Sequence, residues 1–171
     1  MKQFFIYTLA VVFLAACSNG PKGEKAATGD AEKAADLAGA TYTVDAEKSI
    51  INWSGSKPTS THTGTIKASE GSISAKDGAI TGGSFTIDMN SIECTDLEGG
   101  KKAGLEGHLK GTESGKEDDF FNVAKYPTAK FEITKVSPVE GEEGVSHEIS
   151  GNLTLKDVTK NVTFKASVTA G

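Results

Sequence analysis

The most constraining feature of the sequence is an alternation of apolar and polar side chains with a period of two, which begins at Thr41 and recurs almost to the last residue. In residues 84–89, for example, Phe85, Ile87 and Met89 share one face, while the polar residues between them share the other. Successive side chains of a β-strand point to opposite faces of a sheet, so the pattern predicts strands with one apolar face. We therefore expect a mostly β domain.

Breaks in the alternation divide this domain into seven or eight short antiparallel strands with a helical interruption. Glycine in Lys76-Asp77-Gly78 favours a tight hairpin turn, Gly82-Gly83 favours a bulge, and residues 156–159 predict a second hairpin. Where the alternation stops, we expect a helix near residues 101–110 and a helical turn near residues 116–123. This order of elements fits a barrel or a sandwich. The expected strands cover residues 42–44, 51–53, 63–69, 72–75, 79–89, 129–133, 149–155 and 162–168.

The first sixteen residues have the composition of a signal peptide, with Lys2 followed by an uncharged, mostly apolar run from Phe4 to Ala16. The run is too short for a permanent membrane helix, which needs about 20 apolar residues. It ends in Leu14-Ala15-Ala16-Cys17, which resembles the lipobox of bacterial lipoproteins. We expect cleavage before Cys17 and attachment of lipid to its thiol. The alternative is an ordinary signal peptide followed by a chance cysteine.

The lipoprotein interpretation predicts a location and a domain order. The chain would be exported and anchored to a bacterial membrane through acylated Cys17, and Ser18 favours the outer membrane over the inner one, with the domain facing the periplasm or the cell surface. Residues 17–40 are rich in Gly, Ala, Lys, Glu and Asp, a composition that predicts a flexible tether. The remaining residues, 41–171, suit a single domain.

Charge and cysteine content exclude two further classes. The formal charge is −5, and all eighteen basic residues are lysines spread along the chain, which argues against nucleic-acid binding. With Cys17 acylated, Cys94 is the only remaining thiol, so no intramolecular disulfide can form. We expect Cys94 to be a small buried residue, with an intermolecular disulfide as the alternative.

Several short motifs follow one another along the domain. They are Tyr42-Thr43-Val44-Asp45, Ile51-Asn52-Trp53, His62-Thr63-Gly64, Phe85 to Met89, Leu105 to Lys110, Asp119 to Val123, Tyr126 to Phe131 and Gly151 to Lys160. In order and spacing they resemble the YceI-like, lipid- or polyisoprenoid-binding family. The resemblance implies a lipocalin-like antiparallel β-barrel whose elongated apolar interior holds an isoprenoid chain or a similar amphiphile. It implies neither a cofactor nor catalytic machinery, so we do not expect an enzyme.

Two departures from the family pattern affect this expectation. The passage from Leu109 to Asp119 is longer than is usual in the family, which predicts an extended loop. The sequence also stops at Gly171, before the last two strands that family members carry, so we expect an incompletely closed barrel. Either the chain is a shortened product, or a partner or a second copy of the chain supplies the missing edge, because unpaired strand edges invite pairing.

The candidate ligand-binding residues are the apolar positions of the predicted strands. Alternation alone leaves open whether they line a cavity or fill a solid core, and the resemblance favours the cavity. An apolar tunnel would remove a long isoprenoid chain from water at about 25 cal/mol per Å². The residues expected to line it are Ile51, Trp53, Phe85, Ile87, Met89, Phe131, Ile133, Leu153 and Phe164.

His62 and His108 are the candidates for contact with a polar head group at the mouth of the cavity. We expect no metal site, because no His or Cys pair has the spacing of a metal-binding motif. No hydrolase motif is present either. The competing hypothesis is an interaction lipoprotein with a solid β core, which recruits a partner through an exposed sheet edge.

Overall fold

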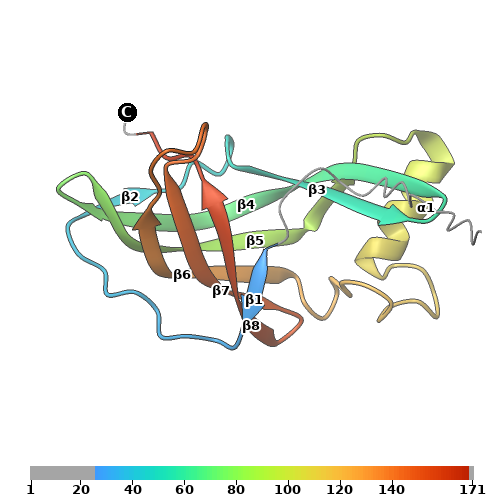
Figure 1. The fold of residues 1–171 in the computed structure, drawn as a ribbon. Coiled ribbons are helices and arrows are strands. Elements are labelled where there is room, and N and C mark those ends of the chain that lie inside the picture. Colours follow the sequence, from blue (N-terminus) through green and yellow to red (C-terminus); the bar gives the residue numbers. More distant parts are fainter. Residues whose placement is uncertain (1–25, 170–171) are drawn as a thin grey trace, which may run out of the picture.

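The computed structural model describes residues 26–169, which form one antiparallel sheet of eight strands and one helix (Figure 1). Neighbouring strands follow the order β1-β8-β7-β6-β5-β4-β2, and β3 pairs with the free half of β4. The prediction of a mostly β domain is therefore confirmed. The elements are β1 (Ala27–Gly29), β2 (Ala40–Thr43), β3 (Ile50–Lys57), β4 (Ser60–Lys76), β5 (Ala79–Cys94), α1 (Gly99–Lys110), β6 (Thr128–Pro138), β7 (His147–Leu155) and β8 (Val158–Ala166).

The two longest strands, β4 and β5, form a long antiparallel ribbon in the middle of the fold. Two strands expected over residues 63–69 and 72–75 are one continuous strand, because β4 passes through Gly71 without leaving the sheet. The ribbon turns at Asp77 and Gly78, which both have positive φ, as a two-residue hairpin of type I′ requires. The bulge predicted near Gly82 lies at Thr81, which has no partner on β4.

A second irregularity bends β5 and builds the small core of the domain. Lys67 pairs with Asp88, whereas Thr65 pairs with Glu93, so β5 holds extra residues between these pairs. The excursion turns both Met89 and Ile92 inward, although regular alternation would place residues three apart on opposite faces. The core cluster consists of Met89, Ile92, Val123 and Ala129, with Ile66, Ile87, Leu109, Phe121 and Leu155 packed against it.

The predicted helix is confirmed as α1, and its end explains why no second helix follows. Gly111 adopts a left-handed conformation beyond Lys110, and the Thr112 N–H donates to the Gly107 carbonyl, which together cap the helix. The helical turn expected over residues 116–123 is wrong, since this segment forms non-helical turns. Its backbone N–H groups instead bind the last carbonyls of α1, as the Val123 N–H does at 2.9 Å from the Lys110 oxygen.

The segment before β2 differs from the expected free tether, because residues 26–39 lie along the sheet. Ala27, Thr28 and Gly29 pair with the outer edge of β8 (Figure 1). Backbone hydrogen bonds hold this segment, and they compensate for its lack of apolar side chains. The expected signal peptide, Cys17 and the first part of the tether lie outside the described residues.

The sheet does not close into a barrel. The strands at its two ends, β1 and β2, do not pair with each other, so an open barrel, as expected, is confirmed. Helix α1 lies at one end of the molecule and the C-terminal end of β8 lies towards the other (Figure 1). Within residues 26–169 no helix combines the length and the apolar character needed to cross a membrane.

Candidate functional site

The inner face of the open sheet surrounds a cavity of about 790 Å³, called the inner cavity below. Its walls come from β3 to β8 and from the segments that follow β2 and β8. Pockets for small ligands hold about 300–1,000 Å³ and have mostly apolar walls, so both size and lining suit an apolar ligand. The lining residues are Val44, Lys48, Ser49, Ile50, Ile51, Ala68, Ile73, Ile80, Phe85, Ile87, Phe131, Ile133, Ile149, Leu153, Val162, Phe164, Ala166, Ser167, Val168 and Thr169.

Seven of the nine residues expected to line a cavity lie around this one, and two do not. Met89 shares a face with Phe85 and Ile87, but it packs in the core cluster and does not line the cavity. Trp53 lies on β3 opposite Gly64, so close that a Cβ at Gly64 would overlap the indole ring. The seven that the structure brings together are Ile51, Phe85, Ile87, Phe131, Ile133, Leu153 and Phe164.

Other residues that line the inner cavity were not predicted from the sequence. Ile149 and Val162 had the right signal, because each stands two or four positions from an expected lining residue on its strand. Ile80 precedes the bulge at Thr81, which shifts it out of phase with Phe85 and Ile87, whereas Ile73 has regular alternation on its own strand. Lys48 belongs to the turn before β3, and the hydrogen bond from the Ala68 N–H to the Ser49 carbonyl holds the end of that turn beside β4 at the cavity.

Three phenylalanine rings form a row across the cavity wall. The rings of Phe85 and Phe131 stack at 6.4 Å between centroids, and those of Phe131 and Phe164 lie 5.7 Å apart. The central ring lies directly over Gly151 on β7, where a Cβ would overlap it. Gly151 pairs with Ile133 and lies diagonally across from Phe131, so the absence of a side chain at Gly151 leaves room for the Phe131 ring.

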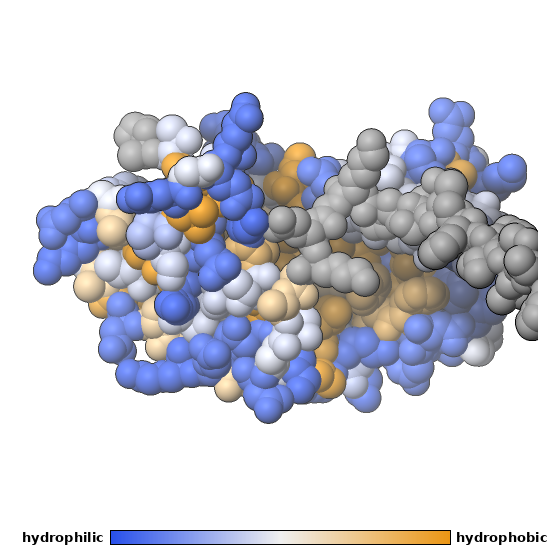
Figure 2. Space-filling view, viewed as in Figure 1, coloured by the Kyte–Doolittle hydropathy of each residue, from blue (hydrophilic) through white to orange (hydrophobic). Residues whose placement is uncertain are grey.

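The opening of the inner cavity is marked by lining residues that also contact solvent. The exposed fractions are 55% for Ile50, 41% for Phe164 and 38% for Ile51. On the face shown in Figure 2, apolar surface appears in patches among hydrophilic side chains. Lys48 is the only charged lining residue; its Nζ lies 3.0 Å from Asp45 Oδ2, and this contact lowers the pKa of the Asp45 carboxyl. The mouth therefore carries one lysine, paired with Asp45, among apolar and uncharged polar residues.

Neither histidine proposed as a head-group contact lines the inner cavity. His62 Nδ1 lies 2.9 Å from Asp96 Oδ2, and His108 Nε2 lies 2.8 Å from Asp119 Oδ2. The backbone N–H of Thr63 donates to Asp96 and, together with His62, lowers the pKa of this carboxyl to about 2. Both histidines thus tie loops to the β4 and α1 regions.

Cys94 is fully buried, as expected, and its Sγ lies 3.3 Å from Asp96 Oδ1. Its backbone N–H donates to Glu106 Oε1 on α1. The residue therefore links the end of β5 to the helix. Among the described residues, no group of three or more His, Cys, Asp or Glu side chains is arranged to hold a metal ion.

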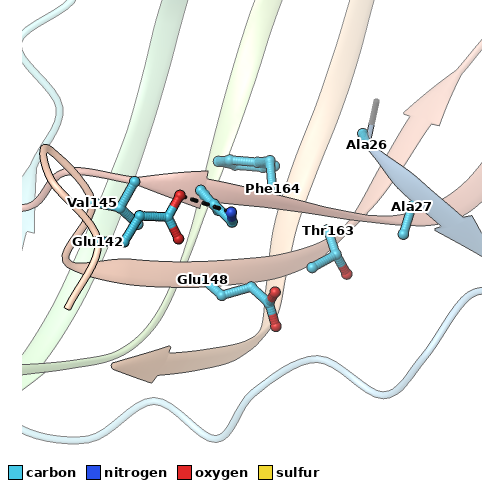
Figure 3. A pocket seen from close by; sticks show the side chains of 8 residues that line it. Ala26, Ala27, Glu142, Val145, Glu148, Thr163 and Phe164 are labelled. Atoms are coloured by element: carbon cyan, nitrogen blue, oxygen red, sulfur yellow. Dashed lines mark hydrogen bonds and ion pairs between the residues drawn. The ribbon is translucent and has the colours of Figure 1, made fainter. Parts of the chain in front are cut away.

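A second hollow, of about 560 Å³, lies at the outer edge of β8 and is called the edge pocket (Figure 3). The Glu142 carboxylate accepts a hydrogen bond from Lys165 Nζ at 2.8 Å across it. Its charged lining makes it less suited to an apolar ligand than the inner cavity. The lining residues are Ala26, Ala27, Glu142, Val145, Glu148, Thr163, Phe164 and Lys165.

Comparison with curated proteins finds several relatives. A UPF0312 protein of Pseudomonas aeruginosa is 45% identical over 83 residues, which make up 48% of this chain and 35% of that protein. A UPF0312 protein of Enterobacter sp. is 36% identical over 107 residues, or 61% of this chain and 47% of the relative. Protein YceI of Salmonella newport has the same identity over 107 residues and is covered to 48%. The matched part of the chain thus spans less than half the length of these relatives.

Solved structures and family models were compared as well. A crystal structure of a mutant CJ YceI protein with a monobromobimane guest aligns with a TM-score of 0.41 and 18% identity, over 99% of this chain and 70% of that one. The family model described as a YceI-like domain matches residues 42–171, which is most of the chain and all of the sheet except β1 and the start of β2. The resemblance seen in the motifs is thereby confirmed, and the chain belongs to the YceI-like family.

Proposed function

We propose that the protein is a membrane-anchored lipoprotein that binds an isoprenoid-type lipid or a similar amphiphile without covalent chemistry. The observation that carries this proposal is the inner cavity, because it is large, has mostly apolar walls and reaches solvent at Ile50, Ile51 and Phe164. Family membership supports the same class of ligand, since it suggests a lipid- or polyisoprenoid-binding protein. The anchor rests on the signal peptide and lipobox that end at Cys17.

The energetics of the cavity favour a long hydrocarbon chain. Burial of each methylene group contributes about 0.8 kcal/mol, so a ligand with several isoprene units gains affinity from length alone. The three-ring row and the aliphatic residues around it offer no hydrogen-bond partners along most of the wall. Selectivity for the polar head group of the ligand would depend on the residues near the mouth, namely Lys48, Ser49, Ser167 and Thr169.

The first experiment examines the bound lipid directly. The mature chain is purified from membranes, extracted into organic solvent and analysed by mass spectrometry, and its melting temperature is measured with and without added isoprenoid quinone. We expect a co-purifying isoprenoid-type lipid and a rise in melting temperature, because a ligand that binds only the folded state stabilises it. No lipid in the extract and no thermal shift would reject the carrier.

The second experiment places the ligand in the inner cavity. Ile149→Trp fills the cavity from β7, and Lys130→Trp adds the same side chain at an exposed position of β6 as a matched control. We expect Ile149→Trp to lower the amount of bound lipid at least tenfold, while the control retains it. Equal lipid in both variants would place the ligand elsewhere.

Attachment of lipid at Cys17 is tested by intact mass. The mature chain should be heavier than its sequence by a diacylglyceryl group, with or without a further acyl chain, and Cys17→Ser should abolish the added mass. An unmodified chain in the membrane fraction would reject the anchor.

The interaction hypothesis predicts a solid interior and a partner on the sheet edge. An interior cavity of about 790 Å³ favours the carrier over this alternative. A strictly monomeric chain by light scattering would count further against an edge that recruits a second copy, whereas a stable dimer without bound lipid would favour it.

A further inference from the structure

The segment of residues 26–39, called the strap below, is held on the outer face of the sheet by a paired hydrogen bond. The Glu32 N–H donates to Asn152 Oδ1 at 2.9 Å, and Asn152 Nδ2 donates to the Glu32 carbonyl at 2.6 Å. Asn152 is itself buried and is fixed by Asn161, whose Nδ2 lies 3.2 Å from Asn152 Oδ1. An amide that satisfies both backbone groups of one residue holds the strap as a neighbouring strand would.

The rest of the strap follows the same outer face. The Ala35 N–H donates to the Ile133 carbonyl at 3.0 Å, and Thr81 Oγ1 donates to the Ala38 carbonyl at 2.7 Å. Asn152 stands next to Leu153, which lines the inner cavity, so side-chain alternation places the strap and the cavity on opposite faces. The strap therefore stays outside the cavity, and none of residues 26–39 lines the cavity wall.

The strap begins beside the mouth. Its first strand, β1, pairs Ala27 with Thr163, and Ala26 and Phe164 line the same edge pocket (Figure 3). Phe164 is also one of the partly exposed residues at the mouth of the inner cavity. Ala26, the first residue that the structure describes, thus lies next to the cavity opening.

Few residues separate the start of the strap from the expected lipid anchor at Cys17. Nine chain steps separate Cys17 from Ala26, and they span at most about 30 Å even when fully extended. If the strap were released as far as Thr41, the same limit would be about 80 Å. Docking of the strap therefore keeps Ala26, at the edge of the sheet beside the mouth, within about 30 Å of Cys17.

The rim of the mouth has the chemistry of a membrane-contacting surface. Ile50, Ile51 and Phe164 expose large apolar side chains around the opening. Burial of such side chains at the boundary between head groups and acyl chains is energetically favourable. Lys48 on the rim is close to Asp45, so the rim has no net positive charge to select anionic lipid. A bilayer of zwitterionic lipid is the surface that this rim fits.

We propose that the strap orients the domain so that the mouth of the inner cavity docks on the bilayer that holds the anchor, and that the ligand passes between membrane and cavity there. This inference rests on the proposed function, because it assumes acylation of Cys17 and a lipid in the cavity. It adds a partner surface, the bilayer, and assigns the docking to Ile50, Ile51 and Phe164.

The experiment uses the mature acylated chain in phosphatidylcholine vesicles that contain a spin-labelled lipid as a fluorescence quencher. Ser167→Cys carries an environment-sensitive dye at the mouth, and Val158→Cys carries it at the other end of β8, about 30 Å away. Buried Cys94 is shielded from the dye. We expect quenching at position 167 to exceed that at position 158 at least twofold. Equal quenching, or stronger quenching at position 158, would overturn the orientation, as would a chain that does not stay on the vesicles.

The role of the strap is tested with Glu32→Pro, which removes the N–H that Asn152 accepts, and with Glu32→Ala, which keeps it. We expect the twofold difference between the two labels to disappear in Glu32→Pro and to persist in Glu32→Ala. Persistence in both variants would overturn the role of the strap. Ile50→Ser should weaken quenching at the mouth, whereas Phe120→Ser, at an exposed residue outside the mouth, should not.

Extraction of lipid from the same samples separates the two proposals. Bound lipid together with equal quenching at both labels rejects the orientation and leaves the carrier function standing. Stronger quenching at position 167 without bound lipid rejects the carrier function and supports docking of the rim on the bilayer.

Discussion

At the scale of single residues, the cavity wall depends on the missing side chain of Gly151. A Cβ at this position would overlap the ring of Phe131, the central ring of the aromatic row. Gly151→Ala should therefore lower the free energy of unfolding by about 1–3 kcal/mol, as overpacking does, and should reduce lipid binding. Urea denaturation checks the first effect. Gly55→Ala is the control, because no atom lies within 4 Å of its added Cβ, and an equal loss in both variants would contradict the argument.

Asp96 gives the protein a predictable response to acid. The Thr63 N–H and His62 lower the pKa of this carboxyl from 3.8 to about 2 in the folded state. A group with a lowered folded pKa stabilises the fold above its unfolded pKa, and this contribution is lost as the pH falls through the folded pKa. Between pH 4 and pH 2 the melting temperature of the native chain should therefore fall more steeply than that of Asp96→Asn.

Asp36→Asn serves as the control for the acid response, because Asp36 is an exposed residue on the strap whose carboxylate pairs with Lys33. It should keep the native slope of melting temperature against pH, measured by circular dichroism. Identical slopes for the native chain and Asp96→Asn would show that the hydrogen bonds to Asp96 do not couple to stability.

At the scale of elements, the β7–β8 hairpin carries local strain. Its two turn residues, Lys156 and Asp157, have φ of 49° and 61°, a left-handed conformation that costs a non-glycine residue about 1–2 kcal/mol. Asp157→Gly should raise the free energy of unfolding by about 0.5–1 kcal/mol, since type I′ turns favour glycine. Asp157→Val should lower it, and chemical denaturation would show both changes. The opposite order would mean that the turn is not strained.

The irregular part of β5 shows how an element can escape a sequence pattern. The Asp88 carboxylate accepts the Asn90 N–H at 2.9 Å, and Ser91 Oγ donates to the Asp88 carbonyl at 2.6 Å. These local bonds stabilise an excursion that turns Met89 and Ile92 towards one core. Alternation correctly placed Met89 on the same face as Phe85 and Ile87. It did not show that Met89 belongs to the core and not to the cavity wall, because local hydrogen bonds at Asp88 set the irregular backbone there.

At the scale of the whole molecule, β1 protects an open edge of the sheet. It covers part of β8, whose N–H and C=O groups would otherwise be free to pair with another chain. Backbone N–H groups of adjacent strand residues point in opposite directions, so Ala27→Pro together with Thr28→Pro removes a bond to β8 whichever residue donates it. We expect this double variant to self-associate at lower concentration than the native chain, measured by light scattering.

The matched control for edge protection is Ala27→Val together with Thr28→Val, which keeps both N–H groups and favours a strand. It should remain as monodisperse as the native chain. If the proline variant also stays monodisperse over the same concentrations, β1 does not protect the edge.

The β class, the apolar faces of the strands, the hairpin at Gly78 and helix α1 could all be predicted from the amino-acid sequence. These features follow from side-chain periodicity and turn chemistry, which are local. The motifs along the domain also identified the family. Seven of the nine predicted lining residues lie around one cavity because periodicity assigns each residue to a face, whatever the strand order.

Contacts between distant parts of the chain determine which part of that apolar face lines the cavity, which part forms the core, and which segment covers the outer face of the sheet. Met89 packs in the core cluster at the irregular part of β5, and Lys48 lies at the mouth because the Ala68 N–H binds the Ser49 carbonyl and holds the turn before β3 beside β4. The strap docked because buried Asn152 offers a donor and an acceptor to the backbone of a segment that has few apolar groups of its own. Such contacts join residues 120 positions apart, and no local pattern encodes them.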